Sequence, residues 1–183
     1  MKSMTDLGAH PGNMRKRKKR FIPLSNLMAS DAVKTVSDSP HRLEELLLLL
    51  QDSDRCLRDR AAATLAQLAT LHPLRLIPSV HRLREGLTDE SAYVRWNLVY
   101  TLGVLSTLFL SRLQSILPDI MRCLDDQNRI VRFLASKVLA QIAAHSPRTV
   151  EELFLKTEKE APPVVAHILR NSGSTLPDVK RHH

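Results

Sequence analysis

The sequence predicts an all-α solenoid of stacked helical hairpins, and three observations support this fold class. Residues recur at a step of 37 positions, and an internal repeat of this length indicates a solenoid. Leu, Ala and Val carry most of the apolar content, while aromatic residues make up only 4%, which favours helices. The chain has five glycines among 183 residues, which leaves little material for β-turns. We therefore expect an extended surface rather than an enclosed pocket.

Four columns of residues define the repeat, and each Arg of the pattern follows its Asp by six positions. The columns are Asp52, Asp89 and Asp126; Arg58, Arg95 and Arg132; Leu50, Leu87 and Leu124; and Leu65, Leu102 and Leu139. Apolar residues at positions 57, 61, 65 and 68 lie on one face of a helix, which predicts a buried stripe along the second half of the first repeat.

Three helix pairs are predicted in order along the chain. Their ranges are about 40–51 with 54–70, 76–87 with 90–108, and 113–124 with 127–144. His72-Pro73 and Ser146-Pro147 end the first and third pairs, because the residue before a proline disfavours the helical conformation. The corresponding solenoid covers residues 40–171, with repeats at about 40–72, 76–109 and 113–146 and a partial repeat at 149–171.

The segments on either side of the repeats have different predicted roles. Residues 1–20 form a basic arm that we expect to be disordered, because six consecutive cations repel one another. Residues 21–39 are expected to cap the first repeat with a short amphipathic helix, for which Ser25 is a candidate N-cap. The partial repeat has Pro162-Pro163 in its turn and resembles a terminal cap. Residues 172–183 read as a flexible tail.

Most of the net charge of +8 lies in the basic arm. Residues 1–20 contribute +6, whereas residues 21–147 hold 14 basic and 13 acidic side chains. The body therefore lacks the basic composition typical of a duplex-binding surface. The arm itself fits a nuclear-import signal, a patch for nucleic acid or anionic lipid, or a solvated tail without a specific role. Its residues are Arg15, Lys16, Arg17, Lys18, Lys19 and Arg20.

Residues 93–103 and 130–140, which open with Tyr-Val-Arg and Ile-Val-Arg, resemble HEAT repeats. The first repeat departs from this pattern, since Leu57 stands before its Arg. The resemblance covers about residues 40–145 and points to the HEAT-repeat (armadillo-like helical) family. It implies a right-handed superhelical solenoid of about three HEAT-like hairpins plus a degenerate C-terminal cap.

In that family the turn Asp and the helix Arg form a polar ladder between neighbouring repeats, and the Asp and Arg columns of this sequence match those positions. The physical chemistry agrees with this interpretation. An acid near a helix N-terminus meets unpaired backbone N–H groups, and Arg can reach a carboxylate or a turn carbonyl. We expect the six residues to be structural.

The candidate partner-binding residues are Trp96, Tyr100, Phe133 and Lys137. Positions 96 and 133 share one column, positions 100 and 137 share the next, and residues four apart lie on one helical face. Neighbouring helices pack roughly 8–10 Å apart, so these side chains are expected to cluster on the second helices of adjacent repeats. Trp and Tyr are frequent interface anchors. The alternative is that Trp96 and Phe133 pack between repeats.

No catalytic, metal or cofactor signature appears in the sequence. The histidines, cysteines and acids do not have metal-ligand spacing, and the serines lack a nucleophile elbow. Cys56 and Cys123 are expected to be buried, reduced thiols, which indicates a reducing interior. No segment is long and apolar enough for a transmembrane span, and the N-terminus lacks a secretory apolar core. We therefore expect an intracellular protein, nuclear or cytoplasmic in a eukaryote and cytoplasmic in a bacterium.

These observations predict a non-enzymatic scaffold or adaptor that binds another protein through its second helices. The alternative is a nucleic-acid-associated protein led by the basic arm. The five leucines at 46–50 are apolar nearly all round, so either residues 21–39 or a partner must cover them. Self-association through the ends of the solenoid is a further expectation.

Overall fold

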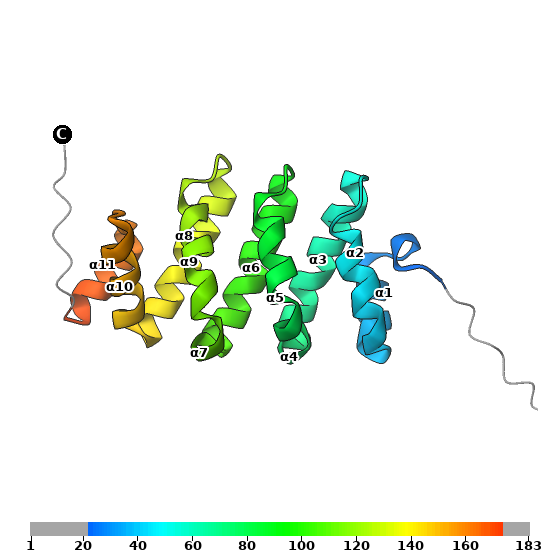
Figure 1. The fold of residues 1–183 in the computed structure, drawn as a ribbon, viewed down its shortest axis with the longest axis horizontal. Helices are drawn as coiled ribbons and strands as arrows, with labels where there is room; N and C mark the ends of the chain where they lie inside the picture. The colour runs from blue at the N-terminus through cyan, green and yellow to red at the C-terminus, as the bar shows by residue number, and fades with distance from the viewer. Residues whose placement is uncertain (1–21, 174–183) are drawn as a thin grey trace, which may run out of the picture.

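Residues 22–173 are described by a computed structural model, and within this range the ordered elements are helices. Figure 1 shows these helices stacked in a single row from α1 at one end to α11 at the other. The predicted fold class, an all-α repeat solenoid, is confirmed. The basic arm and residues 174–183 lie outside the described residues, so the predictions made for them remain predictions.

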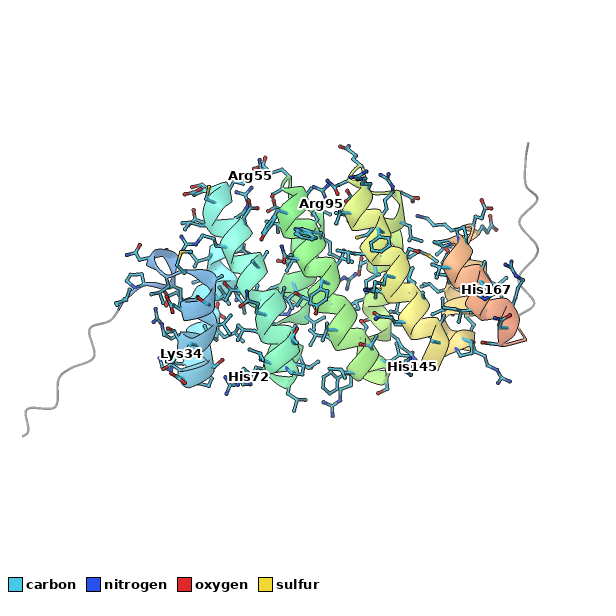
Figure 2. All side chains as sticks on the ribbon, turned by 180° about the vertical axis from the view of Figure 1, so that it is seen from behind. Lys34, Arg55, His72, Arg95, His145 and His167 are labelled. Atoms are coloured by element: carbon cyan, nitrogen blue, oxygen red, sulfur yellow. The ribbon has the colours of Figure 1, made fainter. Side chains whose placement is uncertain are left out.

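The helices form two layers (Figures 1 and 2). We call the first the B-helix layer, and each of its members packs against the next. It consists of α1 (Ala29–Asp38), α3 (Arg55–Leu71), α6 (Ala92–Leu108), α9 (Arg129–His145) and α11 (Pro163–Asn171). The opposite layer consists of α2 (Leu43–Leu49), α5 (Val80–Glu85), α8 (Leu117–Arg122) and α10 (Pro147–Thr157).

Helices α3, α6 and α9 have the same length of 17 residues, and their first residues are separated by the 37-residue step. Side chains cap two of them: Asp54 accepts the N–H of Cys56 at 2.8 Å, and Asn128 accepts the N–H of Ile130 at 2.9 Å. Such caps satisfy backbone donors that have no partner inside the helix. The three helices therefore present equivalent positions side by side.

The first helix of each predicted pair is broken, which corrects the prediction of continuous helices over 76–87 and 113–124. The second pair begins earlier, at Pro73, and both segments pass through short 3₁₀ turns. In the second and third pairs, Pro78 and Pro118 account for the break near the start of α5 and of α8, since each proline lacks an N–H donor and clashes with the preceding helical turn. The short elements are α4 (Pro73–Leu76), η3 (Ile77–Ser79), η4 (Gly86–Thr88), α7 (Leu110–Leu113), η5 (Gln114–Ile116) and η6 (Cys123–Asp125). In the first pair, η2 (Pro40–Arg42) precedes α2.

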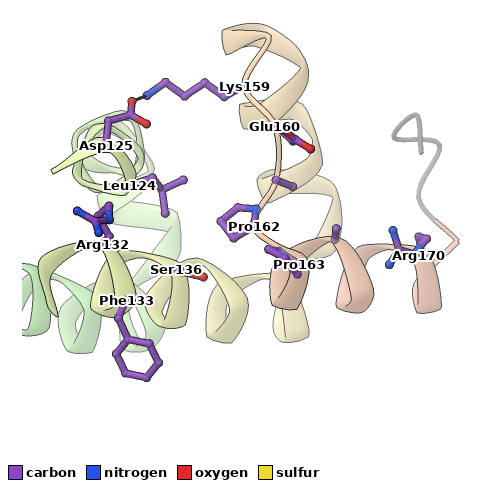
Figure 3. A pocket seen from close by; sticks show the side chains of 12 residues that line it. Leu124, Asp125, Arg132, Phe133, Ser136, Lys159, Glu160, Pro162, Pro163 and Arg170 are labelled. Atoms are coloured by element: carbon purple, nitrogen blue, oxygen red, sulfur yellow. Dashed lines mark hydrogen bonds and ion pairs between the residues drawn. The ribbon is translucent and has the colours of Figure 1, made fainter. Parts of the chain in front are cut away.

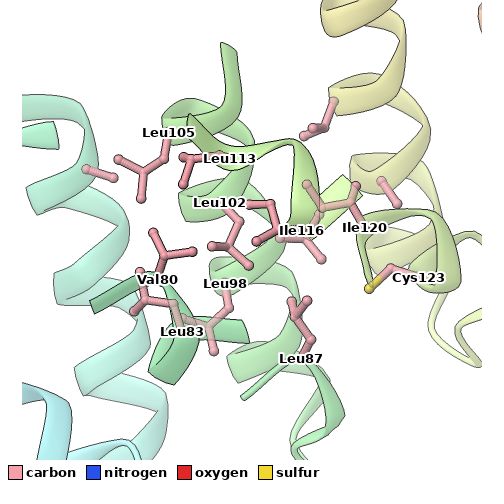
Figure 4. Packing of buried hydrophobic residues seen from close by; sticks show 14 of the residues in the cluster. Val80, Leu83, Leu87, Leu98, Leu102, Leu105, Leu113, Ile116, Ile120 and Cys123 are labelled. Carbon is pink, nitrogen blue, oxygen red and sulfur yellow. The ribbon is translucent and has the colours of Figure 1, made fainter. Parts of the chain in front are cut away.

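A continuous apolar core runs between the two layers. In Figure 4, Leu98 and Leu102 of α6 lie between the α5 side chains and those of the α7–α8 segment. The repeating column Leu65, Leu102 and Leu139 has no exposed surface, as expected for the buried stripe of each repeat. Because the core extends through every repeat, each hairpin is stabilised mainly by its neighbours.

Gly103 allows α6 and α9 to approach each other closely. A Cβ atom at this position would lie 2.4 Å from Cγ2 of Val138 on α9. Carbon atoms cannot come that close, so either the helices or Val138 would have to move. The equivalent positions in the other two repeats are Ala66 and Ala140, which are also small.

Residues 22–39 cover the N-terminal end of the solenoid. Arg42 donates to the carbonyl of Ile22 at 2.7 Å, and the N–H of Leu24 donates to Glu45 at 2.6 Å. Arg60 of α3 donates to the carbonyl of Ser25 at 3.0 Å. These bonds hold the segment against α2 and α3 and bury Leu24.

The details of this N-terminal cap differ from the prediction. Ser25 lies in the 3₁₀ turn η1 (Leu24–Asn26) and is not a helix cap, and α1 begins at Ala29 after the N-cap residue Met28. Leu46 and Leu47 are buried, whereas Leu48 remains 56% exposed. The cap therefore covers most of the leucine run, and Leu48 remains outside its cover.

The two cysteines lie in different environments. Cys123 is buried as expected, but Cys56 is exposed, so the expectation of two buried thiols was wrong for Cys56. Cys56 occupies the same column as Tyr93 and Ile130, both of which are exposed on the outer surface of the B-helix layer. That column faces solvent in all three repeats.

Candidate partner-binding face

The exposed surface of the B-helix layer carries a cluster of large apolar side chains on α6 and α9 (Figure 2). Tyr93 matches Ile130 and Trp96 matches Phe133 at the 37-residue step, because α6 and α9 are in register. We call this cluster the apolar patch, and it consists of Tyr93, Trp96, Tyr100, Ile130 and Phe133. Phe133 is 65% exposed and Tyr100 42% exposed, so neither ring is fully taken up by packing between repeats.

Trp96 has a mixed position within the patch. It is partly buried and packs against the core. Its ring meets that of Tyr93 edge to face, with centroids 5.3 Å apart and planes at 68°. This arrangement is favourable for aromatic pairs and holds both rings in place. Trp96 therefore contributes to packing as well as to the surface.

Polar residues border the patch. Lys137 is exposed on α9, and the Tyr100 hydroxyl lies 3.4 Å from Thr70 Oγ1 on α3. On α3, the position that matches Trp96 is Asp59, which accepts a hydrogen bond from Ser91 Oγ at 2.6 Å. The patch is thus restricted to the second and third repeats and ends at a polar contact on the first.

Sequence reasoning missed two members of the patch, Tyr93 and Ile130. Both precede a predicted site residue by three positions, and residues three apart share a helical face. They also fall in one column at the 37-residue step. This shared column is the sequence signal for both residues, which the repeat motif also contains at the start of its Tyr-Val-Arg and Ile-Val-Arg stretches.

A second set of predicted residues forms regular contacts between repeats, which we call the Asp–Arg ladder. Arg58 Nε donates to Asp89 Oδ2 at 2.8 Å, and Arg95 Nε donates to Asp126 Oδ2 at 2.7 Å. Each Arg therefore binds the Asp that lies 31 positions later, in the next repeat. One such Arg–Asp pair is one rung.

Each ladder residue also organises its own turn. Arg58, Arg95 and Arg132 all donate through Nη1 to the carbonyl of the Asp six positions earlier, at 2.9, 2.8 and 2.7 Å respectively. The Asp side chains accept the backbone N–H two positions later: Asp52 at 2.8 Å, Asp89 at 2.7 Å and Asp126 at 2.7 Å. The ladder thus fixes both the turn geometry and the spacing of adjacent repeats.

The ladder pairs are largely shielded from solvent, which strengthens their interaction. In the second rung, 14% of the Arg95 side chain and 10% of the Asp126 side chain are exposed. The hydrogen bond from Arg95 lowers the pKa of Asp126 below its ordinary value, and the same bond raises the pKa of Arg95. Both groups are therefore charged near neutral pH.

The third Arg of the ladder lacks the acid that its equivalents bind. The position 31 residues after Arg132 is Pro163. In the described part of the chain, the hydrogen bonds that Arg132 makes go through Nη1 to carbonyl oxygens and not to a carboxylate, and its side chain is exposed. Arg132 nevertheless keeps the two carbonyl contacts of its own turn, to Asp126 and Gln127.

A groove with a volume of about 1180 Å³ lies beside Arg132, between α9 and the segment that joins α10 to α11 (Figure 3). The ion pair between Lys159 and Asp125 crosses one end of the groove, and Leu124 and Ser136 belong to its wall. Phe133, a member of the apolar patch, also lines the groove, and its ring projects from α9 on the side away from Lys159 (Figure 3). The groove and the patch therefore adjoin at Phe133.

No group of three or more His, Cys, Asp or Glu side chains within residues 22–173 could hold a metal ion. None of the helices in this range is long and apolar enough to cross a membrane. The buried acid Asp119 is held between Arg84 of α5 and Arg122 of its own helix, which makes it part of the packing between repeats.

Comparison with known proteins places these features in a class of helical repeat proteins. Residues 75–161 match the family Cnd1, described as non-SMC mitotic condensation complex subunit 1, over slightly less than half of the chain. No curated protein matches the sequence.

Several solved structures of engineered proteins share the fold. A designed armadillo repeat protein in complex with the peptide (KR)₄ is 20% identical, with a TM-score of 0.59, over 80% of this chain and 69% of that one. Computationally designed armadillo repeat proteins for modular peptide recognition give 21% identity and a TM-score of 0.59 over 80% and 69% of the two chains. A further engineered protein is 19% identical, with a TM-score of 0.58, over 82% of this chain and 71% of that one.

The fold and the ladder thus define an α-solenoid of stacked helical hairpins. The chain has a HEAT/armadillo-like repeat fold.

Proposed function

We propose that this chain is a non-enzymatic scaffold that binds a peptide segment of another protein across the B-helix layer. The observation that carries this proposal is the apolar patch, in which four side chains are exposed on one face of a folded solenoid. Exposed clusters of large apolar residues bordered by polar ones mark interaction sites. Tyr, Trp and Phe are also the residues that interfaces favour.

The register of the helices supports binding of an extended segment. Equivalent positions on α3, α6 and α9 repeat across the face, so a segment lying across the helices meets one set of side chains per repeat. The solved armadillo structure in complex with (KR)₄ is an example of peptide binding by this fold class. The Cnd1 family description, a subunit of a condensation complex, also agrees with a chain that works within a protein assembly.

The test is affinity purification of the full chain from its source cells, comparing the wild type with the double variant Tyr100→Ser, Phe133→Ser. The matched control is Leu74→Ser, which removes a 65% exposed apolar side chain from α4, outside the patch. We expect the double variant to lose a protein that the wild type and the control both retain, with an unchanged melting temperature. Retention of every wild-type partner by the double variant would contradict the proposal.

Trp96 needs a separate variant because it packs against the core. Trp96→Phe keeps a ring at this position but lowers the contact area. A loss of partner binding without a change in melting temperature would assign Trp96 to the interface, and a large fall in melting temperature would assign it to packing.

The second candidate function is association with nucleic acid through the basic arm, which rests on six consecutive cations at 15–20. Deletion of residues 1–20 separates the two functions. The arm hypothesis expects RNA or DNA affinity to disappear with the deletion and to weaken steeply with salt. The scaffold hypothesis expects protein partners of the patch to remain bound.

A further inference from the structure

We propose that the groove beside Arg132 binds a carboxylate-bearing segment of a partner protein, with the carboxylate seated on Arg132. This site lies beyond the proposed function, since it recognises a carboxylate through Arg132 rather than apolar side chains, although Phe133 belongs to both the groove and the apolar patch. The internal repeat supports this site, because the equivalent residues Arg58 and Arg95 each bind a carboxylate.

The two complete rungs show the ligand that this position accepts. Arg95 holds Asp126 through two bonds, from Nε at 2.7 Å and from Nη2 at 2.8 Å. Arg58 holds Asp89 through Nε and also binds Glu90 through Nη2 at 2.6 Å. The guanidinium group is a planar fork that matches a carboxylate in this two-bond geometry.

Arg132 is already positioned for the same interaction. Its Nη1 donates to the carbonyls of Asp126 and Gln127 at 2.7 and 3.0 Å, as in the other two rungs. These bonds orient the guanidinium group, and the Nε and Nη2 edge is the part that binds Asp in the first two rungs. A preoriented side chain loses less conformational freedom when a ligand binds.

The groove supplies the space that the fourth repeat leaves open. Pro163 stands where the next acid of the ladder would be, and it lines the groove together with Pro162. The volume of about 1180 Å³ exceeds that of a single side chain, so the groove has room for several residues of an extended segment.

Charge complementarity to Arg132 favours an acidic occupant, because the hydrogen bonds of its guanidinium group go to carbonyl groups. The other charged side chains of the groove wall are Lys159, Arg170, Asp125 and Glu160. Lys159 and Asp125 already pair with each other. The apolar part of the wall includes Leu124 and Ala166, which suits a segment that carries its acid beside small apolar residues.

The probe for this site is the octapeptide acetyl-Gly-Leu-Thr-Asp-Glu-Ser-Ala-Tyr-amide, which reproduces residues 86–93, the turn that binds Arg58. The control peptide has Asn and Gln in place of the two acids. Titration of the full-length, ¹⁵N-labelled chain is followed by nuclear magnetic resonance at the Arg Nε–H groups. We expect a saturable shift of the Arg132 signal with the probe and little shift with the control peptide.

Three variants complete the test. We expect Arg132→Gln to weaken probe binding roughly tenfold, as for the loss of a charged hydrogen-bonded pair. Arg132→Lys should weaken it less but measurably, because Lys keeps the charge and loses the fork. The matched control Arg129→Gln removes an exposed cation near the same end of α9, and it should leave the affinity unchanged. Melting temperatures verify that each variant is folded.

The proposal is overturned if both peptides bind equally, if Arg132→Gln retains affinity, or if Arg129→Gln weakens binding as much as Arg132→Gln. It is also overturned if the probe binds only after residues 174–183 are removed or after Asp178→Asn, because the occupant is then the chain's own C-terminal segment. A dimer that Arg132→Gln dissociates in sedimentation would instead identify a second copy as the occupant. None of these readouts depends on the apolar patch, so the two proposals can fail separately.

Discussion

Cys123 and Cys56 differ in exposure, which governs how fast a thiol reacts. Burial raises the pKa of Cys123 from 9.0 to about 11, so this thiol is protonated near neutral pH as well as inaccessible. Only the thiolate is nucleophilic. We expect one thiol per folded chain to react with a maleimide at pH 7, and two after unfolding. Mass spectrometry of the labelled chain measures this, and Cys56→Ser should abolish labelling of the folded protein; rapid labelling of that variant would contradict the burial of Cys123.

The ladder offers a matched pair of arginines for measuring one rung. Arg95→Met leaves Asp126 shielded without its donor, and removal of one partner from such a pair costs about 3 kcal/mol. Arg132→Met occupies the equivalent position but removes no ion pair, so we expect a cost of at most about 1 kcal/mol. Urea unfolding of both variants gives the comparison. Equal losses would mean that the carbonyl contacts, which both residues share, dominate the ladder.

The pKa of Asp126 also predicts how stability depends on pH. Because Arg95 lowers this pKa below the ordinary value of 3.8, the carboxylate contributes stability above that value. The contribution is lost as pH falls through the lowered pKa, when Asp126 becomes protonated. We therefore expect the urea midpoint to fall more steeply below about pH 4 in the wild type than in Arg95→Met. Parallel profiles for the two proteins would contradict this assignment.

At the residue scale, the contacts of the Asp and Arg columns follow from the 37-residue step. The ladder residues occupy equivalent turns because Asp and Arg recur at that step, and the contacts between them are the ones that elementary chemistry expects. The absence of an acid for Arg132 was also visible as Pro163, but the groove beside it depends on where the 158–162 segment runs. Cys56 was misplaced because its neighbour Leu57 belongs to the apolar stripe and the column of Cys56 was not compared with Tyr93.

At the scale of elements, Gly103 sets the distance between α6 and α9. A methyl group at this position meets Val138, and overpacking of a helix interface costs about 1–3 kcal/mol. Ala has a higher helix propensity than Gly by roughly 1 kcal/mol, which offsets part of this cost. We expect Gly103→Ala to lower the free energy of unfolding and Gly103→Ala with Val138→Ala to lower it by less than the two single changes together. Additive losses would show that the contact with Val138 is unimportant.

The long helices of the B layer were predictable, whereas the predicted helices over 76–87 and 113–124 of the opposite layer are broken. Helices α3, α6 and α9 have apolar periodicity and polar N-cap residues, of which Asp54 and Asn128 cap through their side chains, and Pro73 or Pro147 follows just after two of their ends. In the opposite layer the chain takes single turns and 3₁₀ segments around Pro78 and Pro118. The apolar pattern of that layer continues through those breaks, so periodicity alone predicts one helix where the backbone forms several short ones.

At the scale of the whole molecule, the N-terminal cap controls whether the apolar interior stays covered. Residues 24–38 pack on α2 and α3, so their removal would expose side chains such as Leu46 and Ala61, which lie beside Leu24 and Ala32. We expect deletion of residues 1–39 to cause association that grows with concentration, whereas deletion of residues 1–20 has no such effect. Sedimentation velocity distinguishes these outcomes. A monomeric 1–39 deletion would show that the cap is dispensable.

Self-association of the full chain through this end has a separate test, because Leu48 remains exposed. The cap covers most of the leucine run that motivated the expectation. Light scattering of the full chain and of Leu48→Ser at high concentration decides the matter: equal monomeric masses would exclude this end as a contact, and a dimer lost in Leu48→Ser would support it.

Helices α3, α6 and α9 have equal lengths and start at equivalent positions, which bears on how the proposed partner binding could change. Each of these helices presents its own set of outward side chains, and the sets are equally spaced across the exposed surface of the B-helix layer. An exchange in the solvent-facing column at position 56, 93 or 130 would change what one helix presents to the proposed partner, and the buried columns that stack the helices, such as 65, 102 and 139, would be untouched. Binding preference can therefore be rewritten one helix at a time, by evolution or by design, on an unchanged backbone.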